Sequence, residues 1–323
     1  MSEKKTLPVS VAIPTMNRPE SLKHTLESYM SLNAVPDEII VVDQSSDSET
    51  RKKTEAAVKA LPEGVSGKYI YQAEPSTTES RNCAFASAKN DIIIYSDDDV
   101  EPEPAAVENL YRIFIDEYDG KTALVASAGT GGSGPSALKK ILGFITGARS
   151  WKNRNSGNVT MSMLGRYPAG IKKDTPTQWA MGYFFAVRKS LAEKWDIKWD
   201  NVMSGYAYAE DLDYTWRYCI KAGEEKMKCV ISPSVRVKHL VSGEYRIPTK
   251  KHTWLYIVNR HYLLYKHKRP FPARIVLEWC NICRLIERIL KHEKPGDFAA
   301  ALWYSWTHSQ EIRQGKPDCG GRL

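Results

Sequence analysis

Three adjacent aspartates, Asp97, Asp98 and Asp99, are the sharpest chemical signal in the chain. They follow residues 91–95, whose apolar run predicts a buried strand. Side chains alternate on an extended segment, so Asp97 and Asp99 point to one side and Asp98 to the other. Carboxylates this close repel one another unless a cation such as Mg²⁺ or Mn²⁺, which prefers oxygen ligands, neutralises them. The alternative is that the run forms the N-cap of a following helix.

Polar groups also follow two other predicted strands. Residues 14–19 come directly after the strand predicted at 9–13, and residues 43–47 after the strand predicted at 38–43. Ligands of doubly wound sheets bind beyond the carboxyl ends of the strands, so these groups are expected to converge there. Asp43 suits a hydrogen bond to a nucleotide base or ribose, with an Asx-turn as the alternative.

Arg81 stands in a Ser-Arg-Asn triplet near the start of a predicted helix. A guanidinium group there can reach a phosphate or hold the aspartates in place, because it forms strong charge-assisted hydrogen bonds with both. The alternative is an ordinary solvated surface arginine.

The elements that must position these residues alternate between strands and helices. Strands are predicted at 9–13, 38–43, 68–72 and 91–95, with helices beginning at Pro19 and at 47–61 and 79–89 between them. A strand at 179–187, a helix at 210–221 and a strand at 228–231 complete the pattern, and residues 129–134 and 153–173 read as loops. This alternation predicts βαβ units and a mostly parallel sheet covered on both faces.

After about residue 250 the strand signals stop. Helices are predicted at 252–267, 273–291 and 297–312, separated by prolines. The helix at 273–291 is strongly amphipathic. We therefore expect a catalytic domain over residues 1–250 and a basic helical region over residues 251–323.

Charge is unevenly distributed along the 323 residues. The formal net charge is +8, and residues 236–323 contain 17 Lys and Arg against 7 Asp and Glu. Such asymmetry indicates a phosphate-bearing partner: nucleic acid, anionic lipid or a phosphorylated substrate. The six irregularly spaced cysteines indicate reduced thiols, and we see neither a signal peptide nor a membrane span, so we expect a cytoplasmic protein.

Taken together, the motifs resemble family 2 glycosyltransferases of the GT-A fold, over roughly residues 7 to 240. Residues 11–20 resemble the opening strand and nucleotide loop, 38–43 the second strand with its base-binding Asp, and 92–100 the segment that ends in the Asp-x-Asp motif. The fold implied is a mostly parallel, doubly wound α/β sheet, here with a C-terminal helical appendage. The type implied is that of bacterial cell-surface polysaccharide synthesis.

The resemblance also implies roles for individual residues. Asp99, Asp97 and His239 would bind a Mn²⁺ or Mg²⁺ ion. Residues around the nucleotide-sugar donor would be Pro14, Thr15, Asn17, Arg18, Asp43, Ser45, Arg81, Asp97 and Asp98. Trp179, Gly182 and Tyr183 would line the acceptor pocket. Glu210-Asp211 matches the catalytic Glu-Asp motif at the head of a helix, with Asp211 as the base; the alternative is a pair of acids that complements the helix dipole.

The function implied is single transfer of a sugar from a nucleotide-sugar to a hydroxyl of a glycan or lipid-linked acceptor, with inversion at the anomeric carbon. A single-addition enzyme is favoured over a processive synthase, because Thr215-Trp216-Arg217 follows Asp211 in place of a Gln-x-x-Arg-Trp motif and we see no membrane span. A nucleotidyltransferase is one alternative, although residues 14–19 contain no glycine. A basic nucleic-acid-binding protein is another, but the acidic cluster argues against nucleic acid as a partner.

Basic and aromatic residues alternate in the C-terminal region. They are Lys250, Lys251, Arg260, Lys266, Lys268, Arg269 and Arg274, with Trp254, Tyr256, Tyr262 and Tyr265. Helices of this composition can lie on anionic membranes, so we expect peripheral contact with the inner face of the cell membrane. The alternative is that these helices pack on the catalytic domain.

Overall fold

The computed structural model describes residues 5–129, 136–203, 208–244 and 248–316. Its centre is an eight-stranded sheet in the order β3-β2-β1-β4-β10-β6-β11-β9. The strands are β1 (Lys5–Thr15), β2 (Ala34–Asp43), β3 (Ser66–Tyr71), β4 (Ile92–Ser96), β6 (Thr122–Ser127), β9 (Thr175–Pro176), β10 (Phe184–Arg188) and β11 (Lys228–Ser232). β1 to β4 pair in parallel, as does β6 with β11, whereas β10 runs antiparallel between β4 and β6. The predicted, mostly parallel α/β sheet is confirmed.

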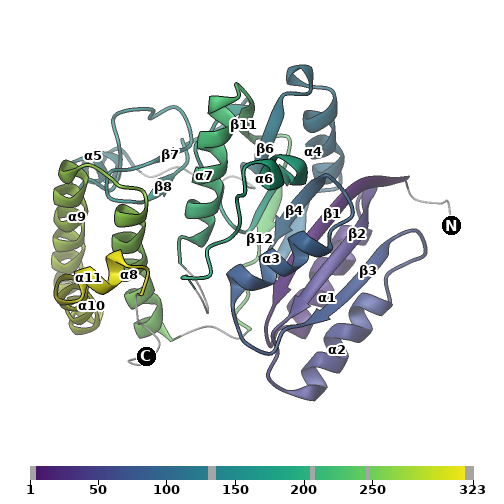
Figure 1. Cartoon of the computed structure of the whole chain (residues 1–323), viewed down its shortest axis with the longest axis horizontal. Coiled ribbons are helices and arrows are strands. Elements are labelled where there is room, and N and C mark those ends of the chain that lie inside the picture. The colour runs from purple at the N-terminus through teal and green to yellow at the C-terminus, as the bar shows by residue number, and fades with distance from the viewer. Residues whose placement is uncertain (1–4, 130–135, 204–207, 245–247, 317–323) are drawn as a thin grey trace.

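Helices cover both faces of this sheet (Figure 1). They are α1 (Pro19–Met30), α2 (Ser48–Lys59), α3 (Thr77–Ser87), α4 (Ala106–Ile115), α6 (Lys189–Lys194) and α7 (Glu210–Glu224), with a short 3₁₀ turn at Tyr118–Gly120. Local sequence explains several starts. Pro19 occupies the first turn of α1, and the Asp47 side chain caps α2 by accepting from the Thr50 N–H at 2.8 Å.

The structure corrects two predictions and excludes one alternative. The strand expected at 179–187 is a strand only from Phe184 onward, and the preceding residues run along a cavity instead. The aspartate run does not cap a helix, because β5 (Val100–Pro102) follows it and pairs with β12 (Val237–His239). Within the loop expected at 153–173 lies a small hairpin of β7 (Asn158–Val159) and β8 (Gly165–Arg166). Of the loop expected at 129–134, only Gly129 belongs to the described residues.

The C-terminal part is helical, as predicted, and comprises α8 (Thr249–Lys266), α9 (Phe271–Leu290), α10 (Pro295–Thr307) and α11 (Ser309–Arg313). One hydrophobic cluster joins side chains of α8 and α10 to Met163, Trp179 and Trp216. None of the described helices meets the length and apolarity that crossing a bilayer requires. Because of the shared hydrophobic cluster, the helical region packs directly on the α/β part.

Two basic residues expected to face a membrane point inward. Arg260 is fully buried and donates to the Ser162 carbonyl, and Lys266 pairs with Asp213 at 2.7 Å. Trp254 and Tyr262 are also buried. The packing alternative therefore holds for these side chains.

Asp213 connects α7 to the end of α8. Burial would raise the pKa of its carboxyl group, but bonds from His267, Arg217 and Lys266 together hold it far below its usual range. This ionised carboxylate is almost fully buried, so its three partners must compensate its charge.

We expect Asp213→Asn to lower the free energy of unfolding by about 3 kcal/mol, because it leaves the half-buried Arg217 without a carboxylate partner and Lys266 with Asp200 alone. Thermal and denaturant unfolding measure this. Asp196→Asn is the control, since the side chain of Asp196 is 84% exposed. Equal stability of the two variants would show that the Asp213 cluster does not hold the helices in place.

Candidate active site

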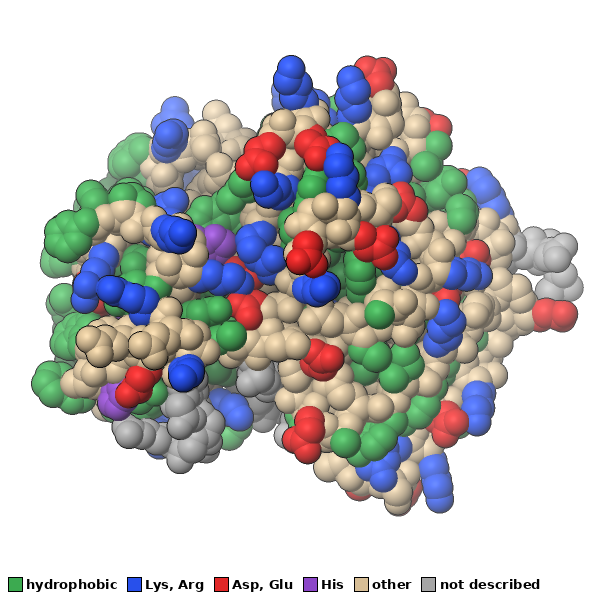
Figure 2. All heavy atoms as spheres, viewed as in Figure 1, with side chains coloured by type: hydrophobic (Ala, Val, Ile, Leu, Met, Phe, Trp, Pro, Cys, Tyr) green, Lys and Arg blue, Asp and Glu red, His purple; other side chains and the backbone are tan. Residues whose placement is uncertain are grey.

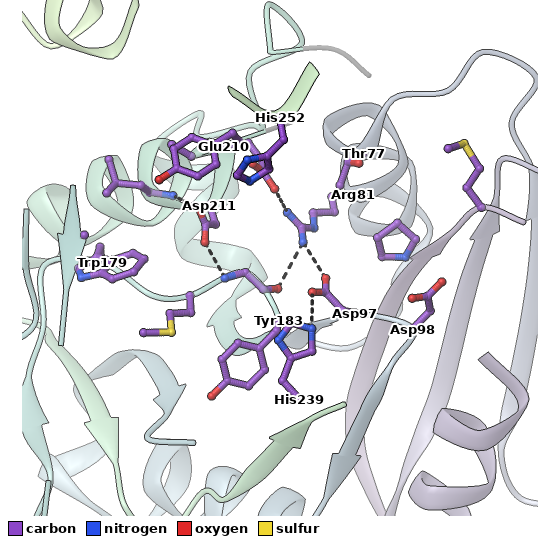
Figure 3. A pocket seen from close by; sticks show the side chains of 18 of the residues that line it. Thr77, Arg81, Asp97, Asp98, Trp179, Tyr183, Glu210, Asp211, His239 and His252 are labelled. Carbon is purple, nitrogen blue, oxygen red and sulfur yellow. Dashed lines mark hydrogen bonds and ion pairs between the residues drawn. The ribbon is translucent and has the colours of Figure 1, made fainter. Parts of the chain in front are cut away.

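A cavity of about 520 Å³ opens at the carboxyl ends of β1 and β4. Its residues come from both halves of the sheet, from the first turns of α3 and α7, and from α8 (Figure 3). They are Pro14, Thr15, Met16, Arg18, Gln44, Pro75, Thr77, Arg81, Asp97, Asp98, Met163, Leu164, Gly165, Arg166, Trp179, Met181, Gly182, Tyr183, Tyr208, Ala209, Glu210, Asp211, Leu212, His239 and His252. The volume suits a ligand of ordinary cofactor size.

Asp97 and His239 line one end of this cavity and form a cluster with Asp99, which is not among the lining residues. Pairing of β5 with β12 places His239 opposite Val100, directly beside the aspartates. The His239 Nε2 atom lies 3.1 Å from Asp99 Oδ1 and 3.9 Å from Asp97 Oδ2, and the three ligand atoms lie within 4.8 Å of one another. Two carboxylates and an imidazole are suitable ligands for a divalent ion.

Arg18 neutralises the other side of the aspartate run. Its guanidinium group donates to Asp98 Oδ1 and to Asp99 Oδ2, each at 2.7 Å. Burial raises the pKa of Asp98, against the opposing effects of Arg18 and of the Thr15 hydroxyl. Burial would also raise the pKa of Asp99, but hydrogen bonds from His239, Arg18 and the Ser242 N–H lower it well below its usual range. Asp99 is therefore an anion.

Arg81 connects this cluster to the opposite end of the cavity. Its Nη2 atom lies 3.2 Å from Asp97 Oδ1 and its Nη1 atom 3.1 Å from Glu210 Oε1 (Figure 3). The side chain is 2% exposed and its guanidinium group packs over the Trp199 ring at 4.5 Å. The predicted phosphate or carboxylate contact of Arg81 is, in this structure, a contact with carboxylates.

Asp211 lies in the first turn of α7, at the far end of the cavity. Its Oδ2 atom accepts the Gly182 N–H at 2.7 Å and its Oδ1 atom accepts the Leu212 N–H at 2.7 Å. Burial, with a further contribution from the neighbouring charge of Glu210, raises the pKa of Asp211 to about 7. A carboxyl group with this pKa can accept a proton near neutral pH.

Three of the predicted donor residues lie beside the cavity and are not among those that line it. Asp43 is fully buried and accepts from the Ser45 N–H at 2.8 Å and from the Tyr69 hydroxyl at 3.0 Å. The Asn17 N–H donates to Ser45 Oγ at 2.9 Å, with Asn17 in the left-handed region at φ 56°. These bonds clip the loop after β1 to the loop after β2. Contact with a nucleotide base stays a prediction.

The predicted acceptor residues all line the cavity. Tyr183 stacks on the His239 ring, with centroids 5.1 Å apart. Trp179 is nearly buried and its Nε1 atom donates to the Arg166 carbonyl at 3.3 Å. A Cβ atom at Gly165 would lie 2.4 Å from the Trp179 ring, so this wall depends on a glycine.

Sequence analysis missed the rest of this wall, namely Met163 to Arg166, Tyr208 and His252. No motif marks these residues. They reach the cavity through packing of α8, whose Arg260 donates to the Ser162 carbonyl and whose Asn259 donates to the Tyr208 carbonyl. The glycine beside Arg166 was the single local signal, and by itself it indicates no more than a turn.

Residues 10–195 match the family model described as Glycosyl transferase family 2. The chain belongs to glycosyl transferase family 2. A search of curated proteins finds no match.

Two solved structures share the fold of this family 2 chain. One is GalNAc-T7 with UDP, GalNAc and Mn²⁺, at 16% identity and a TM-score of 0.55, with 81% of this chain and 51% of that chain covered. The other is the mannosyltransferase PcManGT from Pyrobaculum calidifontis in complex with GDP-Man and Mn²⁺, at 15% identity and a TM-score of 0.51, with 95% and 76% covered. The chain thus spans about half of the GalNAc-T7 chain. These likenesses confirm the predicted GT-A architecture.

Close packing at Gly182 gives a test of the site in this family 2 chain. A Cβ atom there would lie 3.1 Å from Asp211 Cβ and 3.3 Å from Arg81 Nη2. We expect Gly182→Ala to lower the free energy of unfolding by about 1 to 3 kcal/mol through overpacking, as measured by thermal unfolding. Gly223→Ala in α7 is the matched control, because its Cβ would meet nothing within 4 Å. Similar melting temperatures for both variants would contradict the close approach.

Proposed function

We propose that the protein is a metal-dependent, inverting glycosyltransferase. It would move one sugar from a nucleotide-sugar donor to a hydroxyl of a glycan or lipid-linked acceptor, in cell-surface polysaccharide biosynthesis. One observation carries the proposal: the cluster of Asp97, Asp99 and His239, whose ligand atoms could hold a divalent ion, lies at one end of a single cavity, and Asp211, with a pKa of about 7, lies at the other. Family membership supports the class of reaction.

The trio fits a Mn²⁺ or Mg²⁺ ion because its ligand atoms are two carboxylate oxygens and one imidazole nitrogen within 4.8 Å. Bound there, such an ion would neutralise charge that develops on a leaving diphosphate. Asp99 is held in position for this role by Arg18 and the Ser242 N–H. The Mn²⁺ named for both structural neighbours supports the same choice of metal.

The donor would lie along the loops after β1, β2 and β4. Pro14, Asn17 and Asp43 would surround the base, and Thr15, Arg18, Ser45 and Asp98 would hold or support the ribose and diphosphate. Arg81 would keep Asp97 and Glu210 at a fixed separation, since it bonds to both. Glu210 thereby positions Arg81 and raises the pKa of Asp211.

Asp211 would act as the base. Its carboxylate, fixed by the Gly182 and Leu212 N–H groups, would accept the proton of the acceptor hydroxyl while that oxygen attacks the anomeric carbon. Each oxygen retains a lone pair for this task. A single in-line displacement inverts the configuration, and positioned base catalysis contributes about 10²- to 10⁴-fold. Trp179, Gly182 and Tyr183 would line the acceptor side.

We place the enzyme in the cytoplasm, at the inner face of the membrane. The described cysteines, Cys83, Cys219, Cys229, Cys280 and Cys283, are free thiols, which supports a reducing compartment.

We expect Asp211→Asn to lower turnover by about 10²- to 10⁴-fold and to leave donor binding nearly unchanged, because only the base is removed. Release of nucleoside diphosphate, across a panel of nucleotide-sugars with Mn²⁺, measures turnover. In the unaltered protein kcat/KM should fall below about pH 7, tenfold per pH unit, because protonation of Asp211 removes the base. If the Asn variant turns over as fast as the unaltered protein, Asp211 is not the base. If no nucleotide-sugar of the panel releases nucleoside diphosphate, the proposed function is wrong.

Removal of one ligand tests the metal site. We expect His239→Ala to weaken Mn²⁺ binding by at least about tenfold, measured by titration calorimetry without donor. Since a hydrogen bond to Asp99 raises the pKa of His239, Mn²⁺ binding by the unaltered protein should weaken as the pH falls and the imidazole keeps its proton. His24→Ala on α1 is the control, because its side chain is exposed. Equal Mn²⁺ affinities would contradict the site.

A further inference from the structure

Helix α9 is oriented with apolar side chains toward solvent. A stripe of large apolar residues along the helix is between 38% and 71% exposed. It comprises Phe271, Ile275, Trp279, Ile282, Ile286 and Ile289. Their three- and four-residue spacing places them on one face of a helix about 30 Å long.

Polar residues of the same helix face the protein. Asn281 is fully buried and accepts from Arg260 Nη1 at 2.7 Å, and Glu278 lies 3.1 Å from His261 Nε2. The helix thus buries polar groups beside Leu277 and Cys280 and exposes its isoleucines. Exposed apolar patches of this kind mark surfaces that contact an apolar partner, so we expect something apolar to cover the stripe.

A second apolar stripe lies beside the first. Helix α5 (Ala137–Ile145) has no buried side chain, and Leu138, Ile141, Leu142 and Ile145 are 48% to 66% exposed. The two helices meet where Trp279 Nε1 donates to the Ile145 carbonyl at 2.9 Å. We call the exposed stripes of α5 and α9 the apolar face. Apolar side chains gather at the left-hand edge of Figure 2, where Figure 1 places α9.

Positive charge surrounds the apolar face. Residues 136–154 and 271–294 contain ten Lys or Arg against three Glu, a net charge of +7. Lys139 and Lys140 are exposed on α5, between its apolar positions. Trp151 and, on α10, Trp303 are 66% and 65% exposed. Exposed tryptophans, an apolar stripe and a basic surround are typical of helices that lie in the interface of a membrane.

We propose that the apolar face docks onto an anionic lipid membrane. A second copy of this chain is the less suitable occupant, because it would bring two surfaces of net charge +7 together. Anionic lipid instead complements the charge, at roughly 1 kcal/mol per basic residue near the surface. The docking residues thus differ from those predicted on α8, where Arg260 and Lys266 serve internal contacts.

The apolar face is attached to the acceptor wall of the cavity. Arg166, which lines the cavity, donates through Nε to the Ala148 carbonyl at 2.8 Å, and Ser162 Oγ donates to the Gly147 carbonyl at 2.7 Å. Both carbonyls follow directly after α5. If the proposed function holds, docking brings the acceptor side of the cavity close to the bilayer, where a lipid-linked acceptor resides.

Co-sedimentation of the full chain with vesicles tests the proposal. One set is phosphatidylcholine alone, and in the other about a third of the lipid is phosphatidylglycerol. We expect binding to the anionic vesicles at least about tenfold tighter than to the neutral ones, and weaker at high salt. No binding to either set, or equal binding to both, overturns the proposal. Since neither donor nor acceptor is present, the outcome is independent of the proposed activity.

Two pairs of variants locate the surface. Ile275→Asn with Ile286→Asn should weaken vesicle binding about tenfold or more, whereas Ile115→Asn with Ile220→Asn, at similar exposure on α4 and α7, should not. Lys139→Glu with Lys140→Glu should act likewise, against Lys52→Glu with Lys53→Glu on α2 as control. Melting temperatures of all four variants verify folding.

Vesicle binding by the α9 variant equal to that of the unaltered protein would overturn the proposal. A dimer would also overturn it, if sedimentation velocity finds one in a chain that binds no vesicles and the α9 variant is monomeric. A second copy of the chain would then cover the apolar face.

Discussion

Compensation of buried carboxylates is the constraint on which the site depends. Five carboxyl groups, those of residues 97, 98, 99, 210 and 211, gather around one cavity, and the guanidinium groups of Arg18 and Arg81 bond to four of them. Two cations cannot neutralise five anions. Burial raises the pKa of both Asp98 and Asp211 to about 7, so partial protonation of these two groups reduces the excess, and a divalent ion at the Asp97–Asp99–His239 cluster would remove two more charges. The excess of negative charge would repel a free diphosphate, whereas a donor that binds together with a divalent ion is a suitable ligand.

Arg81 gives this arrangement its rigidity, because it is held from three sides. It bonds to Asp97 after β4 and to Glu210 on α7, and it packs over Trp199. Gly182 completes the link, since its carbonyl accepts from Arg81 and its N–H donates to Asp211. These contacts fix the separation between the Asp97–Asp99–His239 cluster and Asp211.

Residues next to predicted strands could be placed from the sequence, because strand ends fix position. Asp97 and Asp99 follow β4, and the parallel sheet brings them to the edge that also holds the loop from Thr15 to Arg18. His239 could be named only by resemblance, since its neighbourhood depends on the pairing of β12 with β5, more than a hundred residues apart. Tyr208 and His252 carried no signal at all, because they reach the cavity through packing of α8 on the α/β part.

Amphipathicity of the segment at 273–291 was readable from the sequence, but the direction of its apolar face was not. The spacing of apolar residues in the sequence shows that one side of a helix is apolar, and in an isolated globular domain that side normally faces the core. Here Asn281 satisfies the buried guanidinium group of Arg260, which in turn holds the Ser162 carbonyl beneath the cavity wall. Leaving a buried charge unpaired costs several kcal/mol, which is more than the cost of exposing an isoleucine side chain to water. Arg260 thereby determines that α9 presents its isoleucines outward, and the surface available for lipid follows from a polar contact in the interior.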